Sequence, residues 1–133
     1  MADFEFHDYS IKVKDAIADI RTAALEEAAG EIESQTKRNT KVKTGRTKNS
    51  WQHKVAEDTA YIGSNYDNAI WEEFGTGDYA LEGNGRKGGW FYEDEEGNGH
   101  FTHGKKPRRA FWNAFNSLKS SIIAMFESRF KGL

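Results

Sequence analysis

The hydrophobic pattern of this chain changes its period at residues 51–63, which read WQHKVAEDTAYIG. Alternate positions carry the residues suited to one face of a strand: Trp51, His53, Val55, Ala60 and Ile62. Between the two halves stands Glu57-Asp58-Thr59, a run of turn formers. Alternation on both sides of a turn predicts a β-hairpin. Because the two ends of the chain have a helical period instead, this stretch favours a mixed fold of helices and strands.

Amphipathic helices are predicted on both sides of the hairpin. The first begins at Asp8 or Ser10, either of which is a competent N-cap, and ends near Lys37. Its apolar residues recur at intervals of three and four: Val13, Ile17, Ile20, Ala24, Ala28 and Ile32. The last helix has Pro107 in its first turn, where proline is tolerated. Its stripe is similar: Phe111, Phe115, Leu118, Ile122, Met125 or Phe126, and Phe130.

Two smaller elements are predicted between the first hairpin and the last helix. A short helix covers residues 69–74, with Asp67 or Asn68 as its cap and Gly75 as its end. A second hairpin covers residues 90–103, where a Gly-Asn-Gly turn separates two short runs rich in aromatic residues. Helices at both ends and hairpins between them indicate an α+β domain.

The expected fold is a single domain over residues 1–133. An antiparallel sheet of two hairpins packs in it against a long amino-terminal helix and a carboxy-terminal helix, with a short helix between. Residues 38–49 and 75–89 are predicted to be mobile loops, because the first is polar and the second is rich in glycine. Only 37% of the residues are hydrophobic, although nine Phe, five Tyr and four Trp are present. A thin core is expected, and neighbouring subunits would help to stabilise it.

Charge and composition exclude several classes of protein. The formal net charge of −2 does not require a polyanionic partner for the molecule as a whole. The chain has no cysteine, which excludes disulfides and thiolate metal sites. No segment has the length and apolarity of a membrane span or a signal peptide. We therefore expect a protein that stays in water and has no membrane partner.

Each pattern that resembles a catalytic or metal site lacks a residue or a spacing that such a site requires. His100 and His103 lie near the carboxylates of residues 93–96, but an odd spacing on a strand directs the two histidines to opposite faces. Gly83-Asn84-Gly85 and Gly97-Asn98-Gly99 lack the strand, helix and lysine spacing of a phosphate loop. No serine has a nucleophile-elbow pattern. We predict no catalytic residue, no metal and no cofactor.

Two basic segments suggest sites of contact. The first could bind phosphates or simply be a solvated loop, and it comprises Lys37, Arg38, Lys41, Lys43, Arg46 and Lys48. The second stands at the positive end of the last helix, where cations are unfavourable, and it comprises Lys105, Lys106, Arg108 and Arg109. An acidic partner surface or a phosphate is expected to compensate this second cluster. Trp112 lies about 100° around the helix from Phe111 and is therefore a candidate partner contact.

Three phrases, in this order, resemble the tailed-bacteriophage family of head-tail joining and tail-completion proteins, also called minor tail proteins. They are TGRTKNSW at 44–51, IGS at 62–64 leading to AIWEEFGTG at 69–77, and KPRRAFW at 106–112. Thr47 departs from the family pattern, in which an aliphatic residue is common. Ile70 and Glu72 also depart from it, since proline and a valine-like residue are typical there.

The resemblance implies a structural virion protein and not an enzyme. It implies a homo-oligomeric ring, six-fold by expectation, between the head connector or adaptor and the tail terminator or tail tube. The protein would pass through the host cytoplasm during assembly. In the short helix Phe74 would anchor the core, Gly75 would take a left-handed conformation, and Glu73 would bond a neighbouring backbone group or cation.

Two groups of site residues follow from these expectations. Candidate subunit or partner contacts are Glu73, Phe74, Gly75, Thr76, Arg108, Arg109 and Trp112. A basic loop that could line a DNA channel contains Lys41, Lys43, Arg46 and Lys48. The alternative function is a nucleic-acid-binding module that uses the basic residues of 37–48.

Overall fold

The computed structural model of the protein describes residues 2–41 and 45–131, and within these ranges it describes the side chains from residue 15 onward. The elements in chain order are α1 (Ala2–Asn39), α2 (Arg46–Asn49), β1 (Trp51–Ala56), β2 (Thr59–Ser64), α3 (Asp67–Phe74), the 3-10 helix η1 (Gly77–Tyr79), β3 (Trp90–Glu93), β4 (Gly99–Thr102) and α4 (Ala110–Lys131). This order of helices and hairpins confirms the predicted α+β class.

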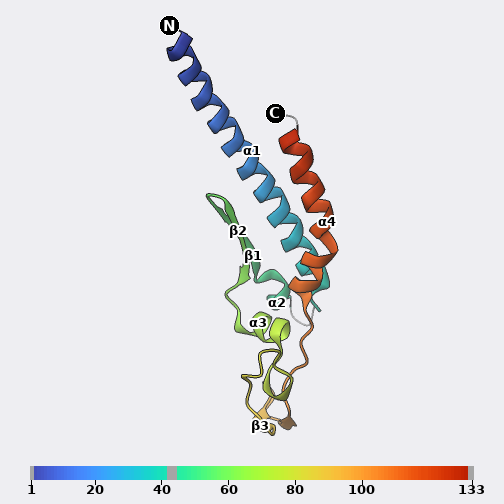
Figure 1. Ribbon diagram of the computed structural model, residues 1–133. Coiled ribbons are helices and arrows are strands. Elements are labelled where there is room, and N and C mark those ends of the chain that lie inside the picture. Colours follow the sequence, from blue (N-terminus) through green and yellow to red (C-terminus); the bar gives the residue numbers. More distant parts are fainter. Residues whose placement is uncertain (1, 42–44, 132–133) are drawn as a thin grey trace.

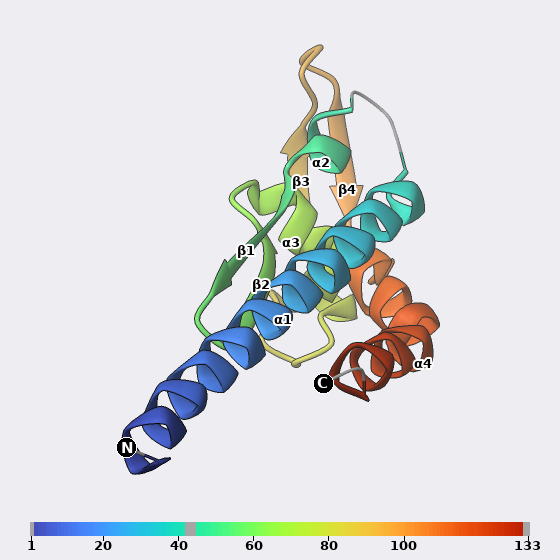
Figure 2. The ribbon, with the colours of Figure 1, turned by 90° about the horizontal axis from the view of Figure 1, so that it is seen from above.

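The molecule is elongated, as Figure 1 shows. The long helix α1 lies between the hairpin β1–β2 on one side and α4 on the other, which Figure 2 shows from above. The segment from η1 to β4 forms a small glycine-rich lobe at the end opposite the amino terminus. The accessible surface is 9640 Å². A compact monomer of this mass would expose about 7,100 Å², so the chain is far from spherical.

The core lies along the carboxy-terminal half of α1 and is built largely from small side chains. Its buried apolar residues within the described ranges are Ala24, Ala28, Ala29, Ile32, Trp51, Ala69 and Ala114. Trp51 is 3% exposed, and its indole stacks on Phe111 of α4 with 6.2 Å between ring centroids. The predicted face of α1 is confirmed from Ala24 to Ile32. Nearer the amino terminus Ile17 is 40% exposed, and the side chain of Val13 lies outside the described residues.

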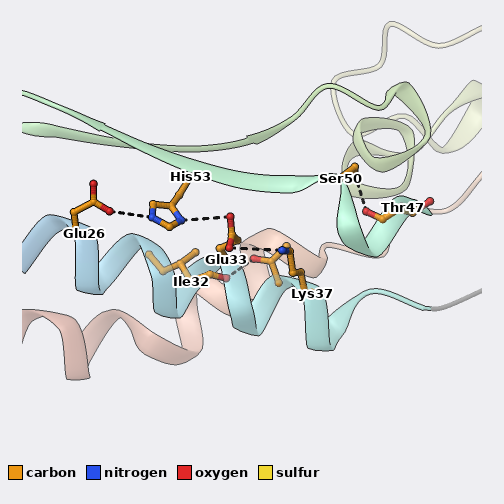
Figure 3. Close-up of polar contacts among 8 residues, drawn as sticks. Glu26, Ile32, Glu33, Lys37, Thr47, Ser50 and His53 are labelled. Carbon is orange, nitrogen blue, oxygen red and sulfur yellow. Dashed lines mark hydrogen bonds and ion pairs between the residues drawn. The ribbon is translucent and has the colours of Figure 1, made fainter. Parts of the chain in front are cut away.

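One histidine ties the first hairpin to α1. His53 of β1 lies between two carboxylates of the helix, as Figure 3 shows. Its Nδ1 is 3.3 Å from Glu33 Oε1 and its Nε2 is 3.1 Å from Glu26 Oε2. Glu33 also pairs with Lys37, one helical turn further on, at 3.6 Å. The inward position of His53 agrees with the period of two, whereas its carboxylate partners come from a distant part of the sequence.

Both predicted hairpins form. In the first, β1 and β2 pair from Trp51↔Ser64 to Ala56↔Thr59, so Thr59 belongs to the strand and not to the turn. In the second, β3 and β4 pair from Trp90↔Thr102 to Glu93↔Gly99. Within residues 2–41 and 45–131 the hairpins remain two separate two-stranded sheets. They stay apart because they lie at different levels of the elongated molecule, with α3 between them.

The structure corrects the predicted limits of α1 and of the loop that follows it. The helix begins at Ala2, before Asp8 and Ser10, since no proline or glycine interrupts the preceding residues. It ends at Asn39, two residues beyond Lys37. Residues 46–49 of the predicted loop form the single turn α2, whereas residues 42–44 lie outside the described ranges. The mobility of this loop stays a prediction.

Two predicted helix starts are also wrong. Helix α4 begins at Ala110, so Pro107 precedes the helix instead of occupying its first turn. Arg109 has a φ of 58°, a left-handed conformation that prevents the helix from starting earlier. Helix α3 spans Asp67–Phe74 and therefore includes both predicted caps. Its N-cap is Tyr66, which makes no side-chain capping bond.

Candidate functional site

A single buried carboxylate organises the junction between α3 and α4. Glu73 is 3% exposed, and its Oε1 accepts a hydrogen bond of 2.7 Å from the backbone N–H of Phe111. Its Oε2 accepts one of 3.3 Å from the N–H of Trp112. Both N–H groups belong to the first turn of α4, where intrahelical bonds leave donors unsatisfied. The negative charge also lies at the positive end of the helix dipole, so Glu73 caps α4 from another helix.

Arg109 completes this junction. Its Nε lies 3.5 Å from Glu73 Oε2, and its Nη1 donates to the Glu73 carbonyl at 3.3 Å. The guanidinium also lies 5.4 Å from the ring centroid of Phe74 and 5.3 Å from that of Trp112. Such distances are typical of cation–π contacts. We call Phe74, Arg109 and Trp112 the Arg109 patch.

The prediction that Phe74 anchors α3 in the core is wrong. Ala69 and Glu73, four residues apart, form the buried face of α3. Ile70 and Phe74, also four residues apart, are 36% and 41% exposed. The helical period was therefore correct, but the helix presents its other face to the interior. Glu73 was expected to bond a neighbouring backbone group or a cation, and within the chain it does both.

The basic residues before α4 were the sequence feature that indicated a nearby anion. Their unfavourable position was expected to need an anion, and Glu73 of the same chain supplies it for Arg109. The Nζ of Lys105 donates to Asn68 Oδ1 at 2.6 Å. Lys106 and Arg108 are exposed and have no carboxylate partner among the described residues. The Nζ of Lys106 lies instead over the Tyr79 ring, 5.6 Å from its centroid.

Gly75 and Thr76 connect this junction to the glycine-rich lobe. Gly75 ends α3 with a φ of 77°, and a Cβ there would lie 2.8 Å from the Tyr79 carbonyl oxygen. Thr76 N donates to the Lys105 carbonyl at 2.9 Å, while Thr76 Oγ1 accepts from Lys105 N at 2.8 Å. Gly77 is buried with a φ of 60°, and a Cβ there would overlap the His103 carbonyl. These glycines allow two backbone segments to cross in close contact.

Two adjoining open grooves lie between α3 and the lobe. They measure about 380 Å³ and 530 Å³ and share Trp71, Thr76 and Trp90 in their walls. The larger groove also contains Phe74 and is therefore continuous with the Arg109 patch. Trp71 is 50% exposed. Exposed aromatic surface of this extent is typical of protein–protein contact.

The histidines of the second hairpin do not converge. His103 Nδ1 is 2.9 Å from Asp78 Oδ2, and His100 Nε2 is 2.8 Å from Asp94 Oδ2. The hydrogen bond with His103, followed by that from the Gly88 N–H, holds the pKa of Asp78 below its ordinary value of 3.8. The hydrogen bond with His100 similarly lowers the pKa of Asp94. In the described part of the chain no three histidine or carboxylate side chains gather as metal ligands.

The described residues of the predicted basic loop differ in exposure and in contacts. Lys41 is exposed and Lys48 is half-buried. The guanidinium of Arg46 lies over the Tyr66 ring, 4.3 Å from its centroid. Lys43 lies outside the described residues. Arg46 thus helps to pack α2 against the start of α3.

These features define a small α+β protein that exposes aromatic and cationic side chains beside a close junction of two helices. Residues 4–75 match the bacteriophage family described as "Bacteriophage HK97-gp10, putative tail-component". The match covers more than half of the chain, which therefore belongs to this family of phage tail components. It is a structural component and not an enzyme. No curated protein and no solved structure matches it significantly. In residues 2–41 and 45–131 no helix is both long and apolar enough to span a bilayer.

Proposed function

We propose that this tail component is one subunit of a homo-oligomeric ring at the head-tail interface, where it completes the tail or joins it to the head connector. The observation that carries the proposal is the number of large apolar side chains that α3, the glycine-rich lobe and the start of α4 expose. They are Ile70, Trp71, Phe74, Tyr79, Leu81, Phe91, Tyr92, Phe101 and Trp112, each at least 36% exposed. Exposed apolar side chains in such number favour contact with other protein chains.

The thin core supports the same proposal. Five of the seven buried apolar residues in the described ranges are alanines, which contribute little buried area each. The surface of 9640 Å² exceeds that of a compact monomer by about a third. Contact with neighbouring subunits would remove part of this surface from water and stabilise the folded chain by mass action.

In such a ring each subunit would use two different faces toward its two neighbours. The proposed contact residues are Glu73, Phe74, Gly75, Thr76, Arg108, Arg109 and Trp112. Of these, Phe74, Arg108 and Trp112 are exposed, whereas Glu73 would act by holding the junction beneath them. The stacked partners would be the head connector or adaptor on one side and the tail terminator or tail tube on the other. Six subunits, and a channel lined by Lys41, Lys43, Arg46 and Lys48, are parts of the same proposal.

The test combines assembly in the phage with assembly in solution. A phage that lacks this gene is expected to produce heads and tails that remain separate in electron micrographs, and the wild-type gene in trans should restore joined particles. Joined, infectious virions without the gene would overturn the proposal. Light scattering of the purified chain should show an oligomer, alone or after addition of connector or tail-tube protein.

The alternative of a nucleic-acid-binding module needs its own measurement. Phosphate contacts by Lys41, Lys43, Arg46 and Lys48 would give DNA an affinity that falls steeply with salt. Titration of duplex DNA at two salt concentrations, with the wild type and with these four residues changed to Ala, separates the two functions. Binding that the wild type shows and the variant loses would favour the module, and no salt-dependent binding would remove it.

A further inference from the structure

The second hairpin, β3–β4, ends in an acidic turn. The only run of four consecutive carboxylates in the chain stands there, Glu93, Asp94, Glu95 and Glu96, and residues 88–104 contain no lysine or arginine. Glu93, Glu95 and Glu96 are exposed and form no ion pair with any described side chain. Asp94 pairs with His100 of the same hairpin. We call residues 93–96 the acidic tip.

The acidic tip has a fixed shape. The Oδ1 of Asp94 accepts hydrogen bonds from the backbone N–H groups of Glu96 and Asn98, at 3.0 and 2.9 Å. The backbone N–H of Asp94 donates to the Asn98 carbonyl at 2.9 Å. Because these bonds order the turn before any partner binds, little conformational entropy is lost when its exposed carboxylates meet a cationic surface.

The structure brings together the two basic segments of the sequence. An open groove of about 530 Å³ between α3 and the start of α4 has Glu72, Lys105, Lys106 and Arg108 in its walls. Glu72 and Arg108 also line an adjoining small cavity, whose wall contains Lys41 from beyond the end of α1. We call Lys41, Lys105, Lys106 and Arg108 the cationic groove. All four are exposed.

The cationic groove has a surplus of positive charge. Besides the four cations, the walls of the groove and the adjoining cavity contain two carboxylates, Glu72 and Glu73. Glu73 is already engaged by Arg109. In the described part of the chain none of the four cations forms an ion pair: the Nζ of Lys105 bonds a side-chain amide, and that of Lys106 lies over an aromatic ring. Four cations are thus left with one carboxylate, and the groove suits an acidic partner.

The acidic tip of a subunit is directed away from its own cationic groove. Strand β4 leads from the tip through residues 103 and 104 directly into the groove, so the tip and the groove lie at opposite ends of the hairpin. A strand of four residues spans about 13 Å. Figure 2 shows the turn between β3 and β4 extending past the helices. Only a second molecule can therefore bring an acidic tip into the groove.

We propose that the acidic tip of one copy docks in the cationic groove of the next copy. The carboxylates of Glu93, Glu95 and Glu96 meet Lys106, Arg108 and their neighbours. Each copy has one tip and one groove, so every tip in a closed assembly finds a groove. The contact joins unlike faces, so successive copies follow head to tail and a rotation can close them into a ring. The inference rests on the proposed ring and names two surfaces that would build it.

Reversal of the charges tests the contact. The tip variant of the full-length chain carries Glu95→Lys with Glu96→Lys, and the groove variant carries Lys106→Glu with Arg108→Glu. Should a double variant fail to fold, the single changes Glu96→Lys and Arg108→Glu replace it. Circular dichroism verifies the fold of each variant. Sedimentation in the analytical ultracentrifuge at about 50 mM salt, where charges are weakly screened, measures self-association.

Two control variants make the same changes of charge elsewhere. Glu57→Lys with Asp58→Lys reverses two exposed carboxylates at the turn of the first hairpin, β1–β2. Lys54→Glu with Lys119→Glu reverses two exposed lysines on β1 and α4. The controls separate the loss of one contact from a general effect of net charge on association.

The tip variant and the groove variant should each self-associate about tenfold more weakly than the wild type, and each control should differ by less than about twofold. An equimolar mixture of the tip and groove variants should recover association. In an alternating assembly the acidic tip of the groove variant meets an unchanged groove, and the basic tip of the other variant meets an acidic groove. Recovery of this kind supports the contact.

The other outcomes overturn it. If the wild type forms oligomers and both test variants equal it, the contact is wrong while the ring stands. If the groove variant in addition loses a salt-dependent binding of duplex DNA, the groove binds phosphates instead. If only one test variant is weakened, or if the mixture does not recover, the tip and the groove contact other surfaces. If the wild type stays monomeric at every concentration, alone and with connector or tail-tube protein, the ring itself is wrong as well.

Discussion

Replacement of Glu73 by alanine should destabilise the folded chain more than any other change of a single carboxylate described above. It removes the acceptor of two backbone N–H groups of α4 and the counterion of Arg109. Removing one partner of a buried ion pair costs about 3–5 kcal/mol. Arg109 has a side-chain exposure of 24% and can turn toward water, so the lower end of that range applies. We expect a loss of about 3 kcal/mol, or roughly 12 °C in Tm for a chain of this length.

Urea and thermal unfolding followed by circular dichroism measure this loss. The matched control is Glu72→Ala. Among the described residues its carboxylate accepts one long bond, of 3.4 Å from Asn68, and its loss should cost about 0.5 kcal/mol of folding stability. Glu73→Gln should fall between the two, because its amide oxygen can still accept from the Phe111 N–H. A Glu73→Ala variant that loses less than about 1 kcal/mol, or no more than the control, would refute the assignment of Glu73 as the cap of α4.

Three further outcomes are expected. Gly77→Ala should lower the free energy of unfolding, measured by calorimetry, by at least about 2 kcal/mol more than Gly83→Ala does. Both glycines have a positive φ, but of these two only Gly77 has a carbonyl oxygen where a Cβ would lie. Equal losses would contradict the close contact between the two backbone segments. The carboxyl of Asp78 should titrate by NMR below 3.8, and His103→Ala should raise the midpoint of this titration. Because the pKa of Asp78 is lowered in the folded state, its contribution to stability is present above pH 3.8 and disappears as the pH falls through the folded pKa. Trp112→Ala, at a side chain 47% exposed, should leave Tm nearly unchanged yet weaken self-association, and unchanged self-association would remove Trp112 from the proposed contacts.

The elements that could be predicted are those whose signal is local. The stripe of α1, the alternation in β1–β2 and the glycine turn of β3–β4 all depend on neighbours a few residues apart, and each element formed. The boundaries were less predictable. The start of α4 depends on the left-handed Arg109 and on Glu73, which is distant in sequence, so Pro107 alone was a misleading marker.

The face that a short helix buries could not be predicted in the same way. In α3 the sequence offers two stripes four residues apart, one with Phe74 and one with Glu73, and the general preference for apolar interiors favours the first. The structure buries the second, since the donors of α4 and the guanidinium of Arg109 compensate the carboxylate there. Compensation of this kind depends on residues more than thirty positions away.

The sequence by itself determined the α+β class, the order of helices and hairpins, and the resemblance to phage tail components. It could do so because hydrophobic period, turn residues and short sequence motifs are properties of neighbouring residues. The tertiary structure alone decided that the two hairpins stay separate, that Glu73 lies inside and Phe74 outside, and that α1 extends beyond α4. Those features depend on how segments distant in sequence satisfy one another's charges, hydrogen bonds and apolar surface, and such long-range matching leaves no local pattern.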